Sequence, residues 1–282
     1  MPAFICTACG TQYPPSDKPP AECEICQEER QYTPPTGQSW TTLDSLAARH
    51  FNAFRQHEEG LIGIGSQPTF AIGQRALLVM SPHGNVLWDC ISLIDDATVT
   101  LIKGLGGLKA IAISHPHFYT SMVEWSRAFG CPIYLHTADR DWIMRPDVAV
   151  DLWDGATLPL LPDVTLIRCG GHFPGGTVLH WAKGPGILCS ADIATVTQDR
   201  KFLTFMRSYP NFIPLAAHDV QAIAAALAPF AFDRIYGHYF DRVIATGAKE
   251  VLAASVARYI AAISEGHADN RRANAAGAAA GG

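Results

Sequence analysis

Two histidines separated by one residue stand directly after an apolar run of the chain. Residues 111–114 lead into His115-Pro116-His117. Residues i and i+2 face the same side of an extended backbone, so both imidazoles can aim at one point. Neutral imidazole suits zinc, iron, copper or nickel. In isolation, the pair can equally be two unrelated histidines in a solvated loop, so the rest of the chain has to decide between these interpretations.

Three further side chains that can bind metal occupy the same kind of position. His172 follows the apolar run 164–168 in a glycine-rich turn, Asp192 follows the run 186–189, and His238 follows the run 234–236. The ends of such runs are where loops gather at one edge of a sheet. One histidine at a strand end means little, but four histidines and one aspartate in this arrangement indicate a metal-binding edge.

Four of the eight cysteines form two Cys-x-x-Cys pairs near the N-terminus, namely Cys6, Cys9, Cys23 and Cys26. Four thiolates at this spacing are typical of a closed structural zinc site. A segment this short cannot build an apolar core, so a metal would hold it together. The pattern resembles the zinc ribbon and rubredoxin family. This resemblance implies structural zinc and a structural or protein-binding role, with a rubredoxin-type iron centre or a pair of redox dithiols as alternatives.

The elements that must position these residues follow from apolar periodicity. A short helix is expected over residues 40–50, and apolar runs at 61–65, 69–72, 76–80 and 86–90 predict a β-meander. Further strands are predicted at residues 109–114, 132–136, 164–168, 177–181, 186–189 and 234–236. Further helices are predicted at residues 93–105, 121–129, from 137 onward, 216–228 and 250–265. This order suits an α/β protein in which two packed sheets are covered by helices on both outer faces.

Local composition and the proline- and glycine-containing segments predict the domain organisation. Residues 1–36 are expected to form the zinc ribbon, residues 37–266 the αββα domain, and the Ala/Gly-rich residues 267–282 a disordered tail. The 282 residues are 48% apolar and 17% charged, so a sizeable buried core is expected.

The net charge and the hydropathy of the chain limit the classes of molecule that it is expected to bind. A net charge of −5 argues against a strong electrostatic grip on nucleic acid or on an anionic membrane. No apolar run reaches the roughly 18 residues of a membrane helix. The N-terminus lacks a basic stretch followed by an apolar one, so no secretion signal is predicted. A cytoplasmic protein with a small-molecule substrate is the resulting expectation.

The order of the histidine and aspartate blocks resembles the metallo-β-lactamase fold superfamily over roughly residues 55 to 245. That family carries His-x-His-x-Asp-His, then Gly-His, then an aspartate after a strand, then a late Gly-His. The corresponding blocks here are His115-Pro-His117-Phe-Tyr119-Thr120, Gly171-His172, Ala191-Asp192 and Gly237-His238. The resemblance implies an αββα sandwich, first-metal ligands His115, His117 and His172, a bridging carboxylate at Asp192, and His238 as a further ligand.

The chain departs from the family motif at two adjacent positions. Tyr119 stands where the family has aspartate, and Thr120 where it has histidine, and both family residues serve a second metal. A single-metal centre is therefore predicted. Zinc is expected there because the family members are mostly hydrolases. Fe(II) is the alternative, for which the persulfide dioxygenases of the superfamily are a precedent.

These features predict a metal-dependent hydrolase of an ester, lactone or thioester that uses a metal-bound hydroxide. Tyr119 is predicted to donate a hydrogen bond to the developing oxyanion, and Asp192 to act as base or to stay a ligand. Asp89 is expected to orient a ligand from outside the metal shell, and His136 to be an ordinary core or rim histidine. The alternatives are a mononuclear iron oxidoreductase and a non-catalytic binding protein with a degenerate site.

Overall fold

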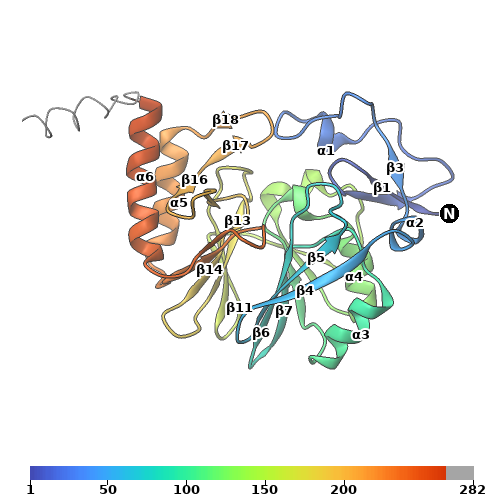
Figure 1. The fold of residues 1–282 in the computed structure, drawn as a ribbon, viewed down its shortest axis with the longest axis horizontal. Helices are drawn as coiled ribbons and strands as arrows, with labels where there is room; N and C mark the ends of the chain where they lie inside the picture. Colours follow the sequence, from blue (N-terminus) through green and yellow to red (C-terminus); the bar gives the residue numbers. More distant parts are fainter. Residues whose placement is uncertain (265–282) are drawn as a thin grey trace, which may run out of the picture.

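The structure is a computed structural model that describes residues 1–264. The predicted tail, 267–282, lies outside the described residues. Two β-sheets pack face to face and helices cover both outer faces, while a small N-terminal unit sits across one edge of the sandwich (Figure 1). The predicted αββα architecture is confirmed.

The first sheet has seven strands in the order β10-β9-β8-β7-β6-β5-β4. From β7 to β10 neighbouring strands are parallel, and from β7 to β4 they are antiparallel. The strands are β4 (Phe51–Glu58), β5 (Leu61–Gln67), β6 (Ala76–Ser81), β7 (Gly84–Trp88), β8 (Ala110–Ala112), β9 (Ile133–His136) and β10 (Val150–Trp153).

The second sheet has six strands in the order β11-β12-β13-β14-β19-β20. Only β14 and β19 are parallel neighbours. The strands are β11 (Thr157–Leu161), β12 (Val164–Arg168), β13 (Thr177–Trp181), β14 (Ile187–Cys189), β19 (Arg234–Tyr236) and β20 (Val243–Ile244). Two short hairpins, β15 (Thr195–Val196) with β16 (Leu203–Thr204) and β17 (Met206–Ser208) with β18 (Ile213–Pro214), extend from it.

Central strands are apolar on both faces because each face enters a different core. In β6, Leu77 and Val79 pack between the two sheets, whereas Leu78 packs under the outer helices of the first sheet. In β14, Ile187 also packs between the sheets, whereas Leu188 faces the outer helices of the second sheet. Successive side chains of a strand point to opposite faces, so a continuous apolar run is what a doubly covered sheet requires.

The outer helices close the two remaining cores. The first sheet is covered by α3 (Asp96–Gly104) and α4 (Met122–Phe129), and the second by α5 (Ala217–Leu227) and α6 (Ala248–Ser264). Asp95 caps α3 by accepting a hydrogen bond from the Thr98 amide, and α4 ends at Gly130, whose φ of 65° suits glycine.

Strand direction brings one set of loops to the same edge. In the first sheet β7 and β8 are parallel, so Asp89 and His115 follow strands that end side by side. In the second sheet β12, β14 and β19 run in one direction, so His172, Asp192 and His238 follow the same ends. The carboxyl ends of parallel strands are the usual place for a site in an α/β fold.

The N-terminal unit is a small sheet in the order β2-β1-β3 with one helical turn. It consists of β1 (Ala3–Cys6), β2 (Gln12–Pro15), α1 (Glu24–Gln27) and β3 (Trp40–Thr41). We refer to residues 1–41 as the ribbon. After it, α2 (Leu43–Ala47) is capped by Thr42, whose hydroxyl accepts from the Ser45 amide.

Several predicted elements are wrong in detail. The helix expected over residues 40–50 is reduced to α2, and the helix expected from residue 137 is a 3₁₀ helix, η2 (Thr137–Trp142). Residues 69–72 form no strand, because they enter a turn in which the Gly73 amide donates to the Phe70 carbonyl at 3.0 Å and Ala71 has a φ of 52°. Several strands are not predicted, among them the edge strands β4, β10 and β11, in which exposed polar residues hide the apolar pattern. The two-residue strand β20 and the short hairpins β15–β16 and β17–β18 are not predicted either.

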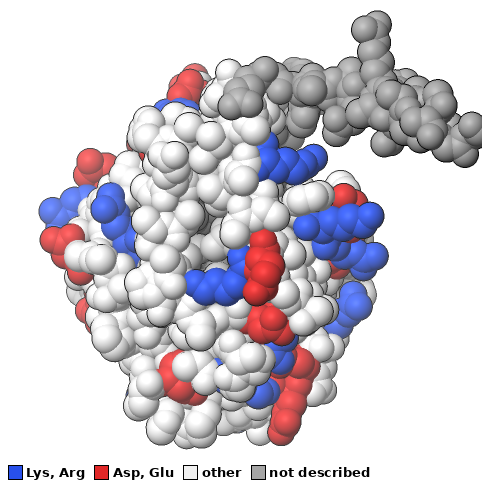
Figure 2. Space-filling view, turned by 90° about the vertical axis from the view of Figure 1, so that its left-hand side faces the viewer, with Lys and Arg blue, Asp and Glu red and all other residues white. Residues whose placement is uncertain are grey.

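The described surface carries charges of both signs. On the face shown in Figure 2, lysine and arginine side chains alternate with aspartate and glutamate and do not gather into one large patch. Of the helices in residues 1–264, none has the length and apolar character needed to cross a membrane.

A pair of glycines tests the packing that leads into β14. Gly186 and Gly155 have nearly the same backbone, with φ of 91° and 90°, but a Cβ at Gly186 would overlap the Ala231 carbonyl, whereas one at Gly155 meets nothing within 4 Å. We expect Gly155→Ala to cost about 1 kcal/mol from backbone strain. Gly186→Ala should cost about 1–3 kcal/mol more. Denaturant unfolding measures both, and equal losses would contradict the steric explanation.

Candidate metal centre

His115 and His117 enter the site from the end of β8. His115 has extended backbone with φ of −169°, and η1 (Pro116–Phe118) begins directly after it. The extended backbone predicted through His117 is therefore wrong, because Pro116 starts a 3₁₀ turn, a position that suits its fixed φ. The turn still brings the two rings together, with 5.1 Å between their centroids.

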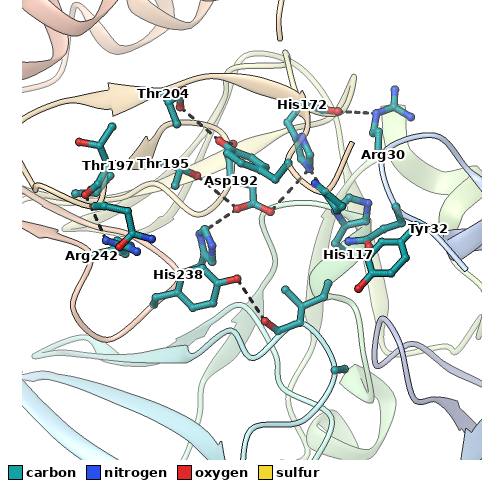
Figure 3. Close-up of a pocket in the computed structure, with 18 of the residues that line it drawn as sticks. Arg30, Tyr32, His117, His172, Asp192, Thr195, Thr197, Thr204, His238 and Arg242 are labelled. Atoms are coloured by element: carbon teal, nitrogen blue, oxygen red, sulfur yellow. Dashed lines mark hydrogen bonds and ion pairs between the residues drawn. The ribbon is translucent and has the colours of Figure 1, made fainter. Parts of the chain in front are cut away.

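Four predicted ligands converge on one point. His115, His117, His172 and Asp192 each offer one ligand atom, and these atoms all lie within 4.8 Å of one another. Nε2 of His172 is 3.3 Å from Nδ1 of His117. Oδ2 of Asp192 is 3.4 Å from Nε2 of His115 and 3.9 Å from Nε2 of His172. Figure 3 shows His117, His172 and Asp192 turned toward this common space.

The donor set fits a metal ion. The three histidines are at most 2% exposed, and Nε2 of His115 has no hydrogen-bond partner among the described residues. Burial lowers the pKa of His115 and His117, and lowers that of His172 to about 3. The rings are therefore neutral, as metal ligands must be. Buried imidazoles without partners are costly, and a cation among them and the carboxylate would remove that cost.

His238 contacts the carboxylate and lies outside the group of four. Its Nδ1 is 3.0 Å from Oδ1 of Asp192. Burial alone would raise the pKa of Asp192, but His238 and His115 hold it well below its usual value. Asp192 therefore offers one oxygen to the ligand group and the other to His238.

The two atypical motif residues do not face the cavity that the site opens into. Tyr119 is 3% exposed and belongs to the core beneath α3 and α4. Thr120 is also buried, with φ of 39°, and its carbonyl accepts from the Gln12 amide of the ribbon. Neither lines the cavity, so the geometry gives no support to Tyr119 as an oxyanion donor.

A different tyrosine reaches the site. Tyr209 lines the cavity, and its hydroxyl donates to the backbone carbonyl of Asp192 at 3.0 Å. No motif marks Tyr209 in the sequence. Its segment forms the hairpin β17–β18, whose polar turn looks like an ordinary loop.

A hydrogen-bonded chain orients His115. The Ser114 hydroxyl and amide donate to Oδ1 of Asp89 at 2.7 and 2.8 Å, and the same hydroxyl lies 2.8 Å from Nδ1 of His115. Burial raises the pKa of Asp89 to about 7. Asp89 thus acts on the ligand through Ser114, which agrees with its predicted orienting role. Such outer partners fix the ring orientation of a ligating histidine.

The other two loops are anchored by backbone contacts. Nδ1 of His172 lies 2.9 Å from the Met206 carbonyl. Arg75, 1% exposed, donates to the Gly237 carbonyl through Nη2 at 2.8 Å, and the Arg75 amide donates to the His238 carbonyl at 2.8 Å. His136, by contrast, lies away from the cavity, with Nε2 3.1 Å from the Gly155 carbonyl.

The ribbon holds a second potential metal site. Sγ of Cys6 is 3.7 Å from Sγ of Cys26, and Sγ of Cys9 is 3.6 Å from Sγ of Cys23. A zinc ion with four sulfurs at about 2.3 Å places them about 3.8 Å apart, so the four buried cysteines fit tetrahedral zinc.

The ribbon also supports the histidine centre. Nε of Arg30 donates to the His172 carbonyl at 2.8 Å, and its guanidinium lies 4.3 Å from the centre of the Phe173 ring. The Ser208 hydroxyl donates to the Arg30 carbonyl, so the ribbon also holds the hairpin whose Met206 contacts His172. The ribbon is therefore packed against the centre and does not stand apart from it.

The centre opens into a cavity of about 710 Å³. Ribbon residues make up part of its wall, together with the loops after β5, β14 and β19. Figure 3 shows Arg242 and Thr197 on one side, Tyr32 of the ribbon on the other, and the metal-binding side chains between them. The centre thus has the access that a small-molecule substrate requires.

Comparison with known proteins gives one relative and a set of similar folds. No family model matches the chain. The uncharacterized protein YmaE of Bacillus subtilis (strain 168) is 46% identical over 268 residues, which cover 93% of this chain and 97% of YmaE. The chain belongs to the same family as YmaE.

Solved structures that are similar to this chain include metallo-β-lactamases. FIM-1 from Pseudomonas aeruginosa, in its mono-zinc form, superposes with a TM-score of 0.56 at 15% identity and covers 73% of this chain and 95% of its own. DIM-1 gives a TM-score of 0.56 at 14% identity over the same shares. At this identity the likeness establishes the metallo-β-lactamase fold alone.

Ser114 provides a test of the orienting chain. Ser114→Ala should lower the affinity of the centre for zinc about tenfold or more, because His115 loses the hydroxyl that orients it. Competition with a chromophoric chelator measures this affinity. Ser121→Ala is the matched control, since the Ser121 hydroxyl is also buried but donates to the Ser92 carbonyl. The same affinity in both variants would refute the role of Ser114.

Arg30 tests the support from the ribbon. Arg30→Ala should weaken zinc binding at the histidine centre about tenfold and leave the cysteine site filled, because His172 loses its contact with the ribbon. Equilibrium dialysis against buffered zinc measures both sites. Arg49→Ala, at an exposed arginine outside the cavity wall, serves as control. If Arg30→Ala behaves like Arg49→Ala, the ribbon does not stabilise the centre.

Proposed function

We propose that the chain is a zinc-dependent hydrolase that cleaves an acyl bond (an ester, lactone or thioester) at a mononuclear centre. The ligands would be His115, His117, His172 and Asp192. The observation that carries the proposal is their convergence within 4.8 Å at the base of a cavity of about 710 Å³. The mono-zinc form of FIM-1 supports it as an example of this fold with one zinc ion.

Zinc at such a site acts as a Lewis acid and lowers the pKa of a bound water toward neutrality. His238 lines the cavity next to Asp192, and its Nδ1 is 3.0 Å from the carboxylate. A proton released at the base of the cavity can therefore be accepted by His238 and stabilised there by Asp192. The same histidine can return the proton to the leaving group.

The side chains around the centre favour one metal over two. In the position of the family's aspartate, Tyr119 is directed into the core, and Thr120 is buried against the ribbon. A second ion would have only Asp192 and His238 from the predicted set. Two protein ligands, one of them shared, are few for a second zinc, which is usually held by three or four.

Metal content and turnover test the proposal together. We expect about two zinc ions per chain, one at each group of potential ligands. The count should fall to about one in His117→Ala, with loss of at least about a thousandfold in kcat/KM on an aryl ester, because the metal-bound nucleophile is lost. Elemental analysis and a colorimetric esterase assay give the two readouts.

His136→Ala is the control because His136 is a buried histidine at the end of a neighbouring strand and lies outside the cavity wall. It should keep two zinc ions and most of the turnover. Three metals per chain would overturn the mononuclear proposal. Iron in the purified protein would favour an oxidoreductase, and zinc-loaded protein without turnover on any acyl ester would favour a binding protein.

A further inference from the structure

The two sides of the cavity differ in chemistry. One side carries Arg242, Thr195 and Thr197, and the other, next to the ribbon, carries Tyr32, Ala8 and Ile72 together with Arg30. Figure 3 places Arg242 and Tyr32 on opposite sides of the metal-binding side chains. A ligand that crosses the centre therefore meets Arg242 at one end. At the other end it meets Tyr32, Ala8 and Ile72, beside a guanidinium of Arg30 that is already paired with Glu28.

Arg242 is a buried cation without a carboxylate partner. It is 9% exposed, and none of the ion pairs found within residues 1–264 includes it. Its one side-chain hydrogen bond, from Nη1 to the Thr197 carbonyl, is long at 3.5 Å. A guanidinium has five N–H donors, so most of its capacity is unused.

The other two arginines near the centre have different surroundings. Arg30 pairs with Glu28 at 2.6 Å and donates to the His172 carbonyl. Arg75 is capped by backbone carbonyls of the His238 loop. Arg242 differs from both: it is 9% exposed, and its remaining N–H donors keep contact with solvent and have no acceptor among the described residues. These donors are therefore available to a ligand in the cavity.

The backbone fixes Arg242 relative to the centre. The Gly237 amide donates to the Arg242 carbonyl at 2.8 Å, and the Arg242 amide donates to the Tyr239 carbonyl at 3.2 Å. These bonds close the turn between β19 and β20 that also carries His238. The guanidinium and the proton-accepting imidazole are thus held by one turn, and a ligand bound to Arg242 is positioned against the centre.

We propose that Arg242 binds a carboxylate on the substrate, so that the enzyme acts on acyl compounds that carry a negative charge away from the scissile bond. A guanidinium matches a carboxylate with two parallel hydrogen bonds. The substrate's apolar part then lies along Tyr32 and Ile72. This proposal rests on the proposed hydrolase function for its turnover, but the binding of the carboxylate does not require turnover.

The charge of the cavity selects a carboxylate over a phosphate ester. Three charged side chains besides the histidines line the cavity, namely Arg30, Asp192 and Arg242. Arg30 is paired with Glu28, and Asp192 belongs to the proposed metal-binding group. One guanidinium balances one negative charge. A phosphate monoester carries about −1.5 to −2 at neutral pH and would stay undercompensated there.

Paired substrates of equal shape test the proposal in zinc-loaded protein. The mono-4-nitrophenyl ester of glutarate and 4-nitrophenyl pentanoate differ by a carboxylate in place of a methyl group. We expect kcat/KM to favour the glutarate ester by at least about tenfold, the value of one charge-assisted hydrogen-bonded pair. In Arg242→Ala this ratio should fall to about one, and in Arg242→Lys it should be intermediate, because lysine keeps the charge without the paired geometry. Arg49→Ala should keep the wild-type ratio.

A binding measurement separates failure of this proposal from failure of the hydrolase. Calorimetry with monomethyl glutarate, and with neutral dimethyl glutarate as reference, should give a Kd that rises at least about tenfold in Arg242→Ala but not in Arg49→Ala. Metal content is measured on each sample, so a lost ion cannot imitate a lost carboxylate contact. Arg242-dependent binding without turnover would reject the hydrolase and keep the carboxylate site.

Three results would overturn the carboxylate site. The first is a preference for the glutarate ester that persists in both Arg242 variants. The second is equal binding of the charged and neutral glutarates by the wild-type protein. The third concerns the 4-nitrophenyl ester that carries a phosphonate in place of the free carboxylate of the glutarate ester. A larger Arg242-dependent preference for that compound would assign Arg242 to a phosphate-like group.

Discussion

Three neutral imidazoles and a carboxylate are held together away from water, which is unfavourable in free energy. The rest of the site is built to offset this cost. Each group would be better solvated outside the protein, so the surrounding chain must hold it in place. Ser114 fixes His115, Met206 and Arg30 fix the His172 loop, and the backbone around Arg75 fixes His238. Much of the hydrogen bonding at this edge of the sandwich serves these few side chains.

Local patterns and the family resemblance were sufficient to predict the fold and the four side chains that the structure brings together as candidate ligands. Apolar runs marked the central strands, and the ends of those strands carried His115, His172 and Asp192. Edge strands were missed because exposed polar residues break the apolar pattern. Tyr209 and Arg242 could not be predicted, because their place in the cavity depends on how the β17–β18 hairpin and the turn between β19 and β20 fold, and neither residue belongs to a motif.

Tyr119 shows where motif reasoning reaches its limit. The sequence places it two residues after His117, which suggested a group close to the reacting atoms. After the 3₁₀ turn that begins at Pro116, Tyr119 instead packs into the core, and the Thr120 carbonyl accepts a hydrogen bond from the ribbon. The chemistry of Tyr119 could be read from the sequence, but the direction of its side chain could not.

The docking of the ribbon also has a consequence for how the protein is made. Arg30 leaves the ribosome early, but it contacts residues 142 and 178 positions later in the chain, at His172 and Ser208. Closing such long loops is slow, and it cannot begin before the later segments exist. The four cysteines of the ribbon are present once residue 26 has been made, whereas the histidine group is complete only when residue 192 has been added. A chain that ends before residue 172 would therefore carry all four cysteines of the ribbon but only two of the three histidines of the candidate centre.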